Sequence, residues 1–250
     1  MTRIPWATVF LAALAAPGCS ENSTPSDDAT PTVDAAPPDA IACDPPRVVF
    51  LNKNGGTFTR GFAVDSVENT LTTLLSEEDP EYVAERWPFS ETDWTDTVEQ
   101  VRSLVTAYHI QVVDVDPGAV DHLEVVMTGS SWGGGAGIVA VIMQGACDEI
   151  TPRDIAFVFA NAAGREGSAF KAAWTIGMGG DLYTTLDNPC DLLHVSGSLA
   201  GCDVAPSFTD QDVQCAWAID EPTSCPCTQK PTQNSHREML HAYGSSCPGQ

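Results

Sequence analysis

The distribution of cysteines constrains the fold more than any other feature of this 250-residue sequence. Six of its nine cysteines follow residue 189, in a part of the chain with little hydrophobic periodicity. With Cys19 set aside, an even number remains, which in an oxidising compartment predicts four disulfides whose pairing the sequence leaves open. The candidates are Cys43, Cys147, Cys190, Cys202, Cys215, Cys225, Cys227 and Cys247. Because each bridge adds about 2–4 kcal/mol, the C-terminal part is expected to be held by cross-links more than by packing.

The N-terminus indicates an exported chain. Thr2 and Arg3 form a short basic start, and residues 4–16 are an apolar run too short to serve as a membrane-spanning helix. The following residues 16–20, Ala-Pro-Gly-Cys-Ser, resemble a bacterial lipobox, so residues 1–18 are predicted to be a lipoprotein-type signal peptide and Cys19 the lipidated residue. An ordinary secretory signal is the alternative. The predicted location is the bacterial cell envelope, with the chain anchored by lipid, at the outer membrane rather than the inner, and facing the periplasm or exterior.

Residues 19–46 are predicted to be a disordered tether. They consist largely of Ser, Thr, Pro, Ala and acidic residues, without aromatic or basic side chains, and cannot bury enough apolar area to offset chain entropy. Over the whole chain, 34 acidic and 11 basic residues give a net charge of −23. Nucleic acid is therefore not expected as a partner, and contact with a membrane is expected only through the lipid.

Residues 47–250 are predicted to form a single α/β (α+β) domain. Short apolar runs at 47–52, 110–115, 122–127 and 154–160 predict strands, and residues 58–62 a return strand after a glycine turn. Residues 136–143 are apolar enough for either a strand or a helix. Ser90 begins a capping box followed by helical periodicity over 91–108. Further helices are expected at 168–180 and 232–243.

Residues 171–194 have the outline of a metalloprotease zinc helix. The stretch resembles that of the metzincin metalloproteases, in which H-E-x-x-H-x-x-G-x-x-H supplies three zinc ligands and a general base. On that frame the three histidines, the glutamate and the turn glycine are replaced by Trp174, Met178, Thr184, Thr175 and Asp181, respectively. Zinc binds imidazole, thiolate or carboxylate, so the resemblance implies the fold without the metal. Trp174 and Met178, one helical turn apart, are expected to fill the vacated space by apolar contact.

Other segments extend this resemblance over residues 47–247. Residues 50–57, 113–118 and 156–160 are similar to a group of metzincin-like bacterial exported proteins, and Leu193 stands where that group has the methionine of its Met-turn. The resemblance implies a mixed twisted sheet with an active-site-type helix and a C-terminal helix.

A serine hydrolase is the main alternative. Residues 129–133, Gly-Ser-Ser-Trp-Gly, match G-x-S-x-G after an apolar run and would make Ser131 a nucleophile. The acid and base of a triad would come from Asp187, Asp191, His194, His236 and His241. Against this interpretation, a glycine-rich stretch follows the motif and disfavours the helix that such a nucleophile needs.

The sequence thus predicts a pseudoenzyme of a metallopeptidase fold, with no catalytic residue, metal or cofactor. Its role would be binding or structural, towards an unidentified envelope or extracellular protein or peptide. An active metallopeptidase with unrecognised ligands is the third interpretation. Glu166 is interpreted as a solvated partner of Arg165 rather than a displaced base, and Cys225-Pro-Cys227 as disulfide cysteines rather than a metal clip.

Overall fold

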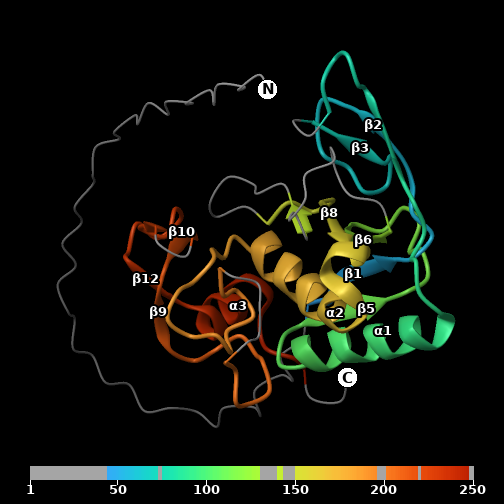
Figure 1. The fold of residues 1–250 in the computed structure, drawn as a ribbon. Helices are drawn as coiled ribbons and strands as arrows, with labels where there is room; N and C mark the ends of the chain where they lie inside the picture. The colour runs from blue at the N-terminus through green and yellow to red at the C-terminus, as the bar shows by residue number, and fades with distance from the viewer. Residues whose placement is uncertain are drawn as a thin grey trace, which may run out of the picture. The chain divides into compact units, whose positions relative to one another are not determined.

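A five-stranded sheet forms the centre of the structure (Figure 1). The computed structural model describes residues 44–72, 75–129, 140–142, 150–195, 201–218 and 221–247. The strands of this central sheet are β1 (Arg47–Asn52), β5 (Ile110–Val113), β6 (His122–Thr128), β7 (Ala140–Ile142) and β8 (Ile155–Phe159). Their order is β5-β1-β6-β8-β7, parallel throughout except for β7, which pairs antiparallel at the edge. The described structure is therefore mixed α and β, as predicted, and residues 140–142 of the ambiguous apolar run are a strand.

The two faces of the central sheet differ because successive side chains of a strand point to opposite sides. On one face Val49, Leu51, Leu123 and Val125 join the larger apolar core, together with residues of two helices. On the other face Val126, Ile155, Phe157 and Phe159 form a second, smaller core. Both cores are built by alternate residues of the same strands.

Helix α1 (Glu91–Val105) covers the first face together with α2 (Ala160–Gly179) (Figure 1). Ser90 caps α1: its hydroxyl accepts from the Asp93 amide, and the Asp93 side chain accepts from the Ser90 amide in return. This confirms the predicted capping box. α2 begins earlier than predicted, because its first turn follows β8 directly, and Gly164 breaks it with φ 72° and ψ 162°. Glu166 lies just after that break with its side chain 89% exposed and 3.4 Å from Arg165.

The second face is covered by a three-stranded layer, β2 (Gly56–Arg60), β3 (Thr70–Leu71) and β4 (Glu81–Ala84). Phe58 of β2 is fully buried and meets Phe157 edge to face, with 5.0 Å between ring centroids. The expected return strand exists, but it does not pair with β1. Gly55, with φ 67°, turns the chain out of the central sheet, and β2 pairs with β3 and β4 instead.

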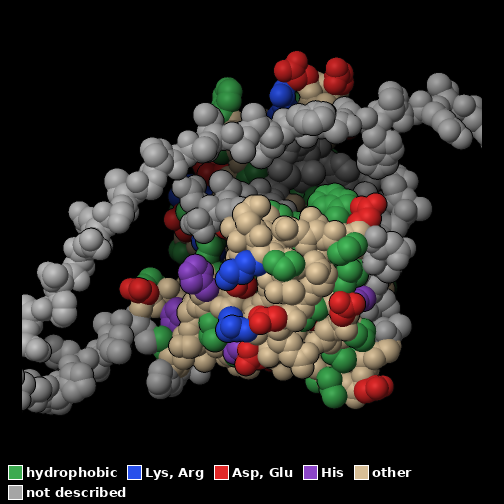
Figure 2. All heavy atoms as spheres, turned by 90° about the vertical axis from the view of Figure 1, so that its left-hand side faces the viewer, with side chains coloured by type: hydrophobic (Ala, Val, Ile, Leu, Met, Phe, Trp, Pro, Cys, Tyr) green, Lys and Arg blue, Asp and Glu red, His purple; other side chains and the backbone are tan. Residues whose placement is uncertain are grey.

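The C-terminal part is cross-linked, as predicted. It contains the short pairs β9 (Asp212–Gln214) with β12 (Thr232–Asn234) and β10 (Ala216–Ala218) with β11 (Glu221–Pro222). Disulfides join Cys190 to Cys202 and Cys215 to Cys225, and Cys227 and Cys247 are also disulfide-bonded. Figure 2 looks onto this side of the molecule, where the described acidic and basic side chains are few and in places lie next to one another.

Helix α3 (Ser235–Tyr243) is the last helix and is shorter than predicted, since residues 232–234 are β12. Asn234 caps it by accepting from the Arg237 amide at 2.9 Å. The buried Tyr243 hydroxyl donates to the Ile176 carbonyl of α2 at 2.6 Å. This bond fastens the last helix to the C-terminal turn of α2.

The described residues belong to one unit, Cys43–Gln250. None of their helices has both the length and the apolar character needed to cross a membrane. The predicted signal peptide, Cys19, residues 19–43 of the predicted tether, and Cys147 lie outside the described residues and stay predictions. Residues 44–46, the end of the predicted tether, are described as irregular backbone, and the Asp44 carbonyl is 2.5 Å from Nε2 of His109.

Candidate functional site

Helix α2 places Trp174 and Met178 on one side. Its small residues Ala169, Ala172 and Ala173 are fully buried and allow the helix to approach the central sheet closely, together with Ile176. Residues four apart share a helix face, so Trp174 and Met178 emerge side by side. Met178 is 6% exposed, whereas Trp174 is only half-buried.

The chain turns sharply after α2 and returns Thr184 to the same side. The amides of Gly180 and Leu182 both donate to the Gly177 carbonyl, at 2.9 and 3.3 Å. Asp181 adopts φ 63°, the left-handed conformation that favours glycine, at the position where the metzincin frame has its turn glycine. Thr184 then donates its hydroxyl to the Ala216 carbonyl.

These three side chains line one cavity of about 340 Å³ beside the edge strand β7, here called the Trp174 pocket. Its full lining is Ala140, Val141, Ile142, Trp174, Met178, Tyr183, Thr184, Val195 and Trp217. The structure therefore places Trp174, Met178 and Thr184 around one cavity. It differs from the expectation in one respect: Trp174 and Met178 line an open space rather than filling it, because Trp174 keeps part of its indole at the surface.

Thr175, at the place of the general base, does not reach the pocket. Its side chain is fully buried and its hydroxyl donates to the Ala172 carbonyl at 2.8 Å. The side chains at Trp174, Met178 and Thr184 are thus an indole, a thioether and a hydroxyl, which do not fit zinc. Among the residues that the structure describes, no group of three or more His, Cys, Asp or Glu side chains could hold a metal ion.

Two contacts of aromatic rings at the pocket were not singled out from the sequence. One joins Trp217 to Tyr183, and the other joins the ammonium of Lys171 to the ring of Trp174. Trp217 of β10 is 71% exposed at the pocket rim and stacks on Tyr183, with 6.4 Å between ring centroids. Lys171 is 8% exposed and holds its ammonium 5.7 Å from the centre of the Trp174 ring. Burial lowers the pKa of Lys171 to about 8. The signal for this contact in the sequence was the spacing of Lys171 and Trp174, three residues apart in a helix.

The turn around Leu193, which the resemblance aligns with the Met-turn, lies against α2. Leu193 is fully buried, and a side-chain carbon added to Gly177 would lie 3.0 Å from Leu193 and 2.8 Å from Phe208. Asp191 organises the turn by accepting from the Leu193 amide at 2.9 Å and from the hydroxyls of Thr209 and Ser235 at 2.8 and 2.7 Å. Burial nevertheless raises the pKa of Asp191, against those hydrogen bonds.

Of the groups nominated for a serine triad, His194 lies near Asp191 and Asp187, whereas His236 and His241 have other surroundings. Nδ1 of His236 is 2.9 Å from the Tyr108 hydroxyl, while His241 is exposed on α3. Burial lowers the pKa of His194, which lies in the field of Asp191, Asp187 and Lys171. Ser131 is outside the described residues, so the hydrolase interpretation stays a prediction.

Comparison with protein-family models, with curated proteins and with solved structures finds no match to this chain. Its function is therefore inferred from the geometry.

Proposed function

We propose that this chain is a metallopeptidase-like binding protein that has lost zinc and peptidase activity and is anchored by Cys19 in the bacterial cell envelope. One observation carries the proposal: the three positions that correspond to zinc ligands line a single pocket and offer no group that binds zinc. The binding role rests on analogy with the metallopeptidase fold. The proposed loss of zinc chemistry rests on the side chains at the three ligand positions.

Two details support the correspondence with the metzincin frame. Asp181, in the place of the turn glycine, adopts φ 63°, a conformation that favours glycine. Leu193, in the place of the Met-turn methionine, lies against Gly177 under the same helix. Neither detail follows from the spacing of Trp174, Met178 and Thr184, so they support the correspondence independently.

An extended polypeptide segment is the occupant that the pocket suits. β7 is the terminal strand of the central sheet, and no described strand pairs with its outer edge. An added strand could hydrogen-bond there, as in other cases of strand addition to a sheet edge. One of its apolar side chains would then enter the Trp174 pocket, with Trp217 at the rim as an aromatic contact of the kind that dominates binding.

Export is supported by the cross-links. All six cysteines of the described residues are disulfide-bonded, which is typical of an oxidising compartment. Lipidation of Cys19 is tested by mass spectrometry of membrane-fraction protein and by Cys19→Ala, which should release the protein from the membrane.

The binding role is tested with an immobilised library of short peptides. The protein should retain extended apolar peptides, and Trp217→Ala should weaken binding about tenfold or more, the range of an interface hot spot. Phe62→Ala is the matched control, because it removes an exposed aromatic side chain that is outside the pocket lining. Equal binding by both variants, or cleavage of the peptides, would overturn the proposal.

The metal frame is tested by restoring it. The triple variant Trp174→His, Met178→His and Thr184→His should bind one equivalent of zinc, while the unaltered protein should carry no stoichiometric transition metal by elemental analysis. Zinc in the unaltered protein, lost on chelation together with peptidase activity, would show that this is an enzyme. Labelling of Ser131 by a fluorophosphonate would favour the hydrolase instead, since that reaction needs an activated nucleophile.

A further inference from the structure

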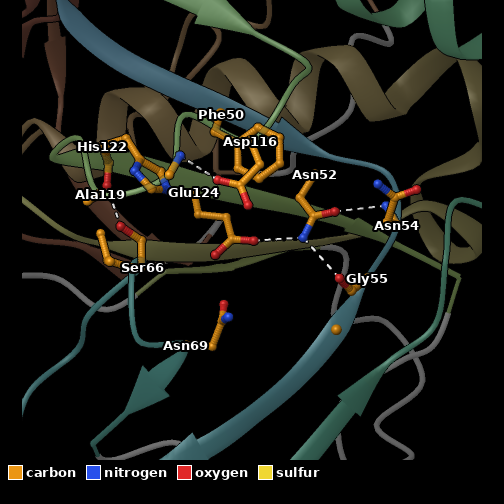
Figure 3. Close-up of a pocket in the computed structure, with 13 residues that line it drawn as sticks. Phe50, Asn52, Asn54, Gly55, Ser66, Asn69, Asp116, Ala119, His122 and Glu124 are labelled. Carbon is orange, nitrogen blue, oxygen red and sulfur yellow. Dashed lines mark hydrogen bonds between the residues drawn. The ribbon is translucent and has the colours of Figure 1, made fainter.

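The second face of the central sheet carries a polar pocket, on the side away from α1 and α2. Phe50 and Asn52 of β1 and His122 and Glu124 of β6 lie on this face as neighbours in the parallel register. They form one wall of a cavity of about 460 Å³, here called the Glu124 pocket (Figure 3). The opposite side is formed by the start of β2 and by the segment from Ser66 to Asn69.

Glu124 is held with one carboxylate oxygen unused. Its Oε1 accepts from the Asn52 amide at 2.7 Å, whereas its buried Oε2 has no hydrogen-bond partner. Glu124 is 2% exposed, and Figure 3 shows its carboxylate directed into the pocket, with Ser66 and Asn69 across the cavity from it. A buried carboxylate oxygen without a donor is costly, so this atom marks a place for a donor from outside the chain.

Asn52 fixes the direction of that carboxylate. Its Nδ2 also donates to the Gly55 carbonyl at 3.0 Å, and its Oδ1 accepts from the Asn54 amide at 2.8 Å. With both ends of the amide in use, Asn52 cannot turn to satisfy Oε2. The glycine turn that diverts β2 from the central sheet therefore also orients Glu124.

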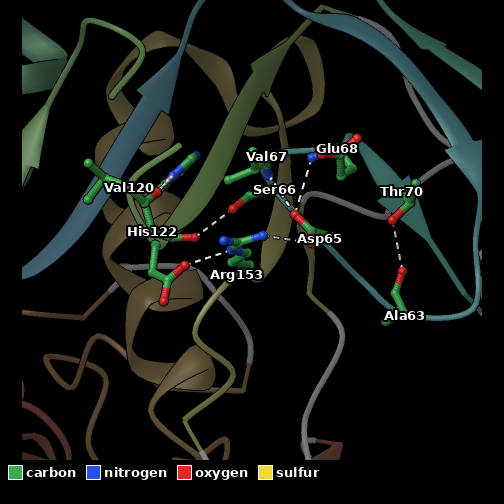
Figure 4. A network of polar contacts seen from close by, with 10 residues as sticks. Ala63, Asp65, Ser66, Val67, Glu68, Thr70, Val120, His122 and Arg153 are labelled. Atoms are coloured by element: carbon green, nitrogen blue, oxygen red, sulfur yellow. Dashed lines mark hydrogen bonds and ion pairs between the residues drawn. The ribbon is translucent and has the colours of Figure 1, made fainter. Parts of the chain in front are cut away.

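The cover of the pocket is fastened by a polar network (Figure 4). The Ser66 hydroxyl donates to the His122 carbonyl at 2.8 Å. Arg153 bridges Asp65 of the cover, at 3.3 Å, to Asp121 next to β6, at 2.6 Å. The cavity is thus preorganised between two parts of the chain that are distant in sequence, which lowers the cost of binding.

The charges of the lining favour a cation. Glu124 lies inside and the exposed Asp116 lies at the rim, and the described lining includes no Lys or Arg. The His122 Nδ1 is 2.6 Å from the Val120 carbonyl, to which it donates. Every carboxylate of the lining is therefore available to a ligand of positive charge, and no cation of the lining competes with it.

We propose that the Glu124 pocket binds a small molecule through a primary ammonium group. Glu124 offers a single free oxygen, which suits one N–H better than the paired donors of a guanidinium. It also falls short of the six to eight oxygens that Ca²⁺ takes. An ammonium group donates three hydrogen bonds, and Asp116, Asn69 and Ser66 supply further oxygens around the same cavity.

Protonation of Glu124 should control this binding. The pKa of Glu124 is raised to about 7, mainly by burial; the hydrogen bond from Asn52 opposes this rise, and the charge of Asp116 adds to it. The other titratable groups nearby are His122 in the lining, the Asp65–Arg153 pair in the cover and Asp154 before β8, whose carboxyl lies in the field of Arg47 and Asp181. Below pH 7 a ligand ammonium must displace the proton of Glu124, so affinity should rise with pH up to about 8 and then level off.

The experiment is a titration of the oxidised full chain with n-pentylamine, followed by ¹H–¹⁵N correlation spectra. Amide signals of the pocket lining should shift, and binding should strengthen about fivefold between pH 6 and pH 7 and about tenfold between pH 6 and pH 8. The uncharged 1-pentanol and the quaternary pentyltrimethylammonium, which has no N–H, should leave those signals unchanged. Equal shifts with either analogue would overturn the proposal.

Matched variants separate this site from general attraction to an acidic protein. Glu124→Gln should weaken pentylamine binding at pH 8 about tenfold or more, whereas Glu81→Gln, the same change at an exposed position on β4, should change it less than about twofold. Asp116→Asn keeps the acceptor for the Gly118 amide and should give an intermediate loss even if Glu124→Gln folds poorly. Unchanged binding in Asp116→Asn and in a folded Glu124→Gln would refute the site.

Discussion

The two faces of the central sheet carry opposite kinds of pocket. On the helical face the Trp174 pocket is lined by apolar and aromatic side chains and lies at the edge strand β7. On the other face the Glu124 pocket is polar and acidic and lies over the middle strands β1 and β6. The difference arises within single strands: Leu123 and Val125 enter the larger core, while His122 and Glu124, alternating with them, face the polar pocket.

The surroundings of the two pockets are stabilised by different kinds of contact. The turn below the Trp174 pocket is fixed by close packing of Leu193, Gly177 and Phe208. The walls of the Glu124 pocket are fixed by directional hydrogen bonds and ion pairs. The first kind of contact is sensitive to side-chain volume and the second to charge and pH.

The largest effect is expected from removing volume under the Trp174 pocket. Leu193→Ala should lower the free energy of unfolding by about 2–5 kcal/mol, the range for truncating a buried leucine, because Leu193 is fully buried. Val115→Ala, at a position 75% exposed, should change it by less than about 0.5 kcal/mol. Urea unfolding measures both. A loss below about 1 kcal/mol for Leu193→Ala would show that the turn does not depend on packing against α2.

The second largest effect is expected in the pH dependence of the free energy of unfolding, to which Glu124 in the polar pocket contributes. In the folded state the pKa of Glu124 is raised to about 7, above its ordinary value near 4.3. The folded protein then holds a proton that the unfolded chain has lost, so the Glu124 contribution is fully present below about pH 4.3 and is lost as pH rises through 7. The loss is on the order of 3 kcal/mol.

Unfolding measured from pH 4 to pH 8 should therefore show a smaller decline in Glu124→Gln than in the unaltered protein. Asp154 is the control from the region of Arg47, because burial also raises its pKa to about 7. Asp154→Asn should remove its own part of the decline and leave that of Glu124. Identical pH profiles for Glu124→Gln and the unaltered protein would contradict the assignment.

The smallest effect concerns the cover of the Glu124 pocket. Arg153→Met breaks partly exposed ion pairs and should cost at most about 1 kcal/mol in stability, but it should speed hydrogen exchange at the amides of Val67 and Glu68, next to Asp65. Arg102→Met is a close match, since Arg102 is 40% exposed, against 39% for Arg153, and also has two carboxylate partners. Arg102→Met should lower the free energy of unfolding by a similar amount without changing hydrogen exchange at the amides of Val67 and Glu68.

Local patterns predicted much of the central layer. The apolar runs gave β1, β6 and β8, and the capping box at Ser90 gave the start of α1. Helical spacing also predicted that Trp174 and Met178 share one face of α2, whereas the place of Thr184 came only from the resemblance to the metzincin frame. The start of α2 was missed because the break at Gly164 suggests a loop rather than helix.

The covering layer and the polar pocket were beyond local patterns. β3 is two residues long, and the direction of β2 depends on the backbone at Gly55. Glu124 gave one signal, a charged residue inside an apolar strand, but its meaning depends on Asn52 and Ser66, which are distant in sequence. Such contacts follow from tertiary structure and not from periodicity.

The bond from Tyr243 to Ile176 has a consequence for biosynthesis. Its two partners are 67 residues apart, and a ribosome adding about 5–20 residues per second needs roughly 3–13 seconds to cover that distance. During this interval α2 and the central sheet have been made, but the part of α2 that packs against Leu193, Phe208 and Tyr243 lacks these partners. The layer that contains the Trp174 pocket is therefore completed only after translation has reached the last helix, and a nascent chain stalled before residue 243 would present this part of α2 to chaperones.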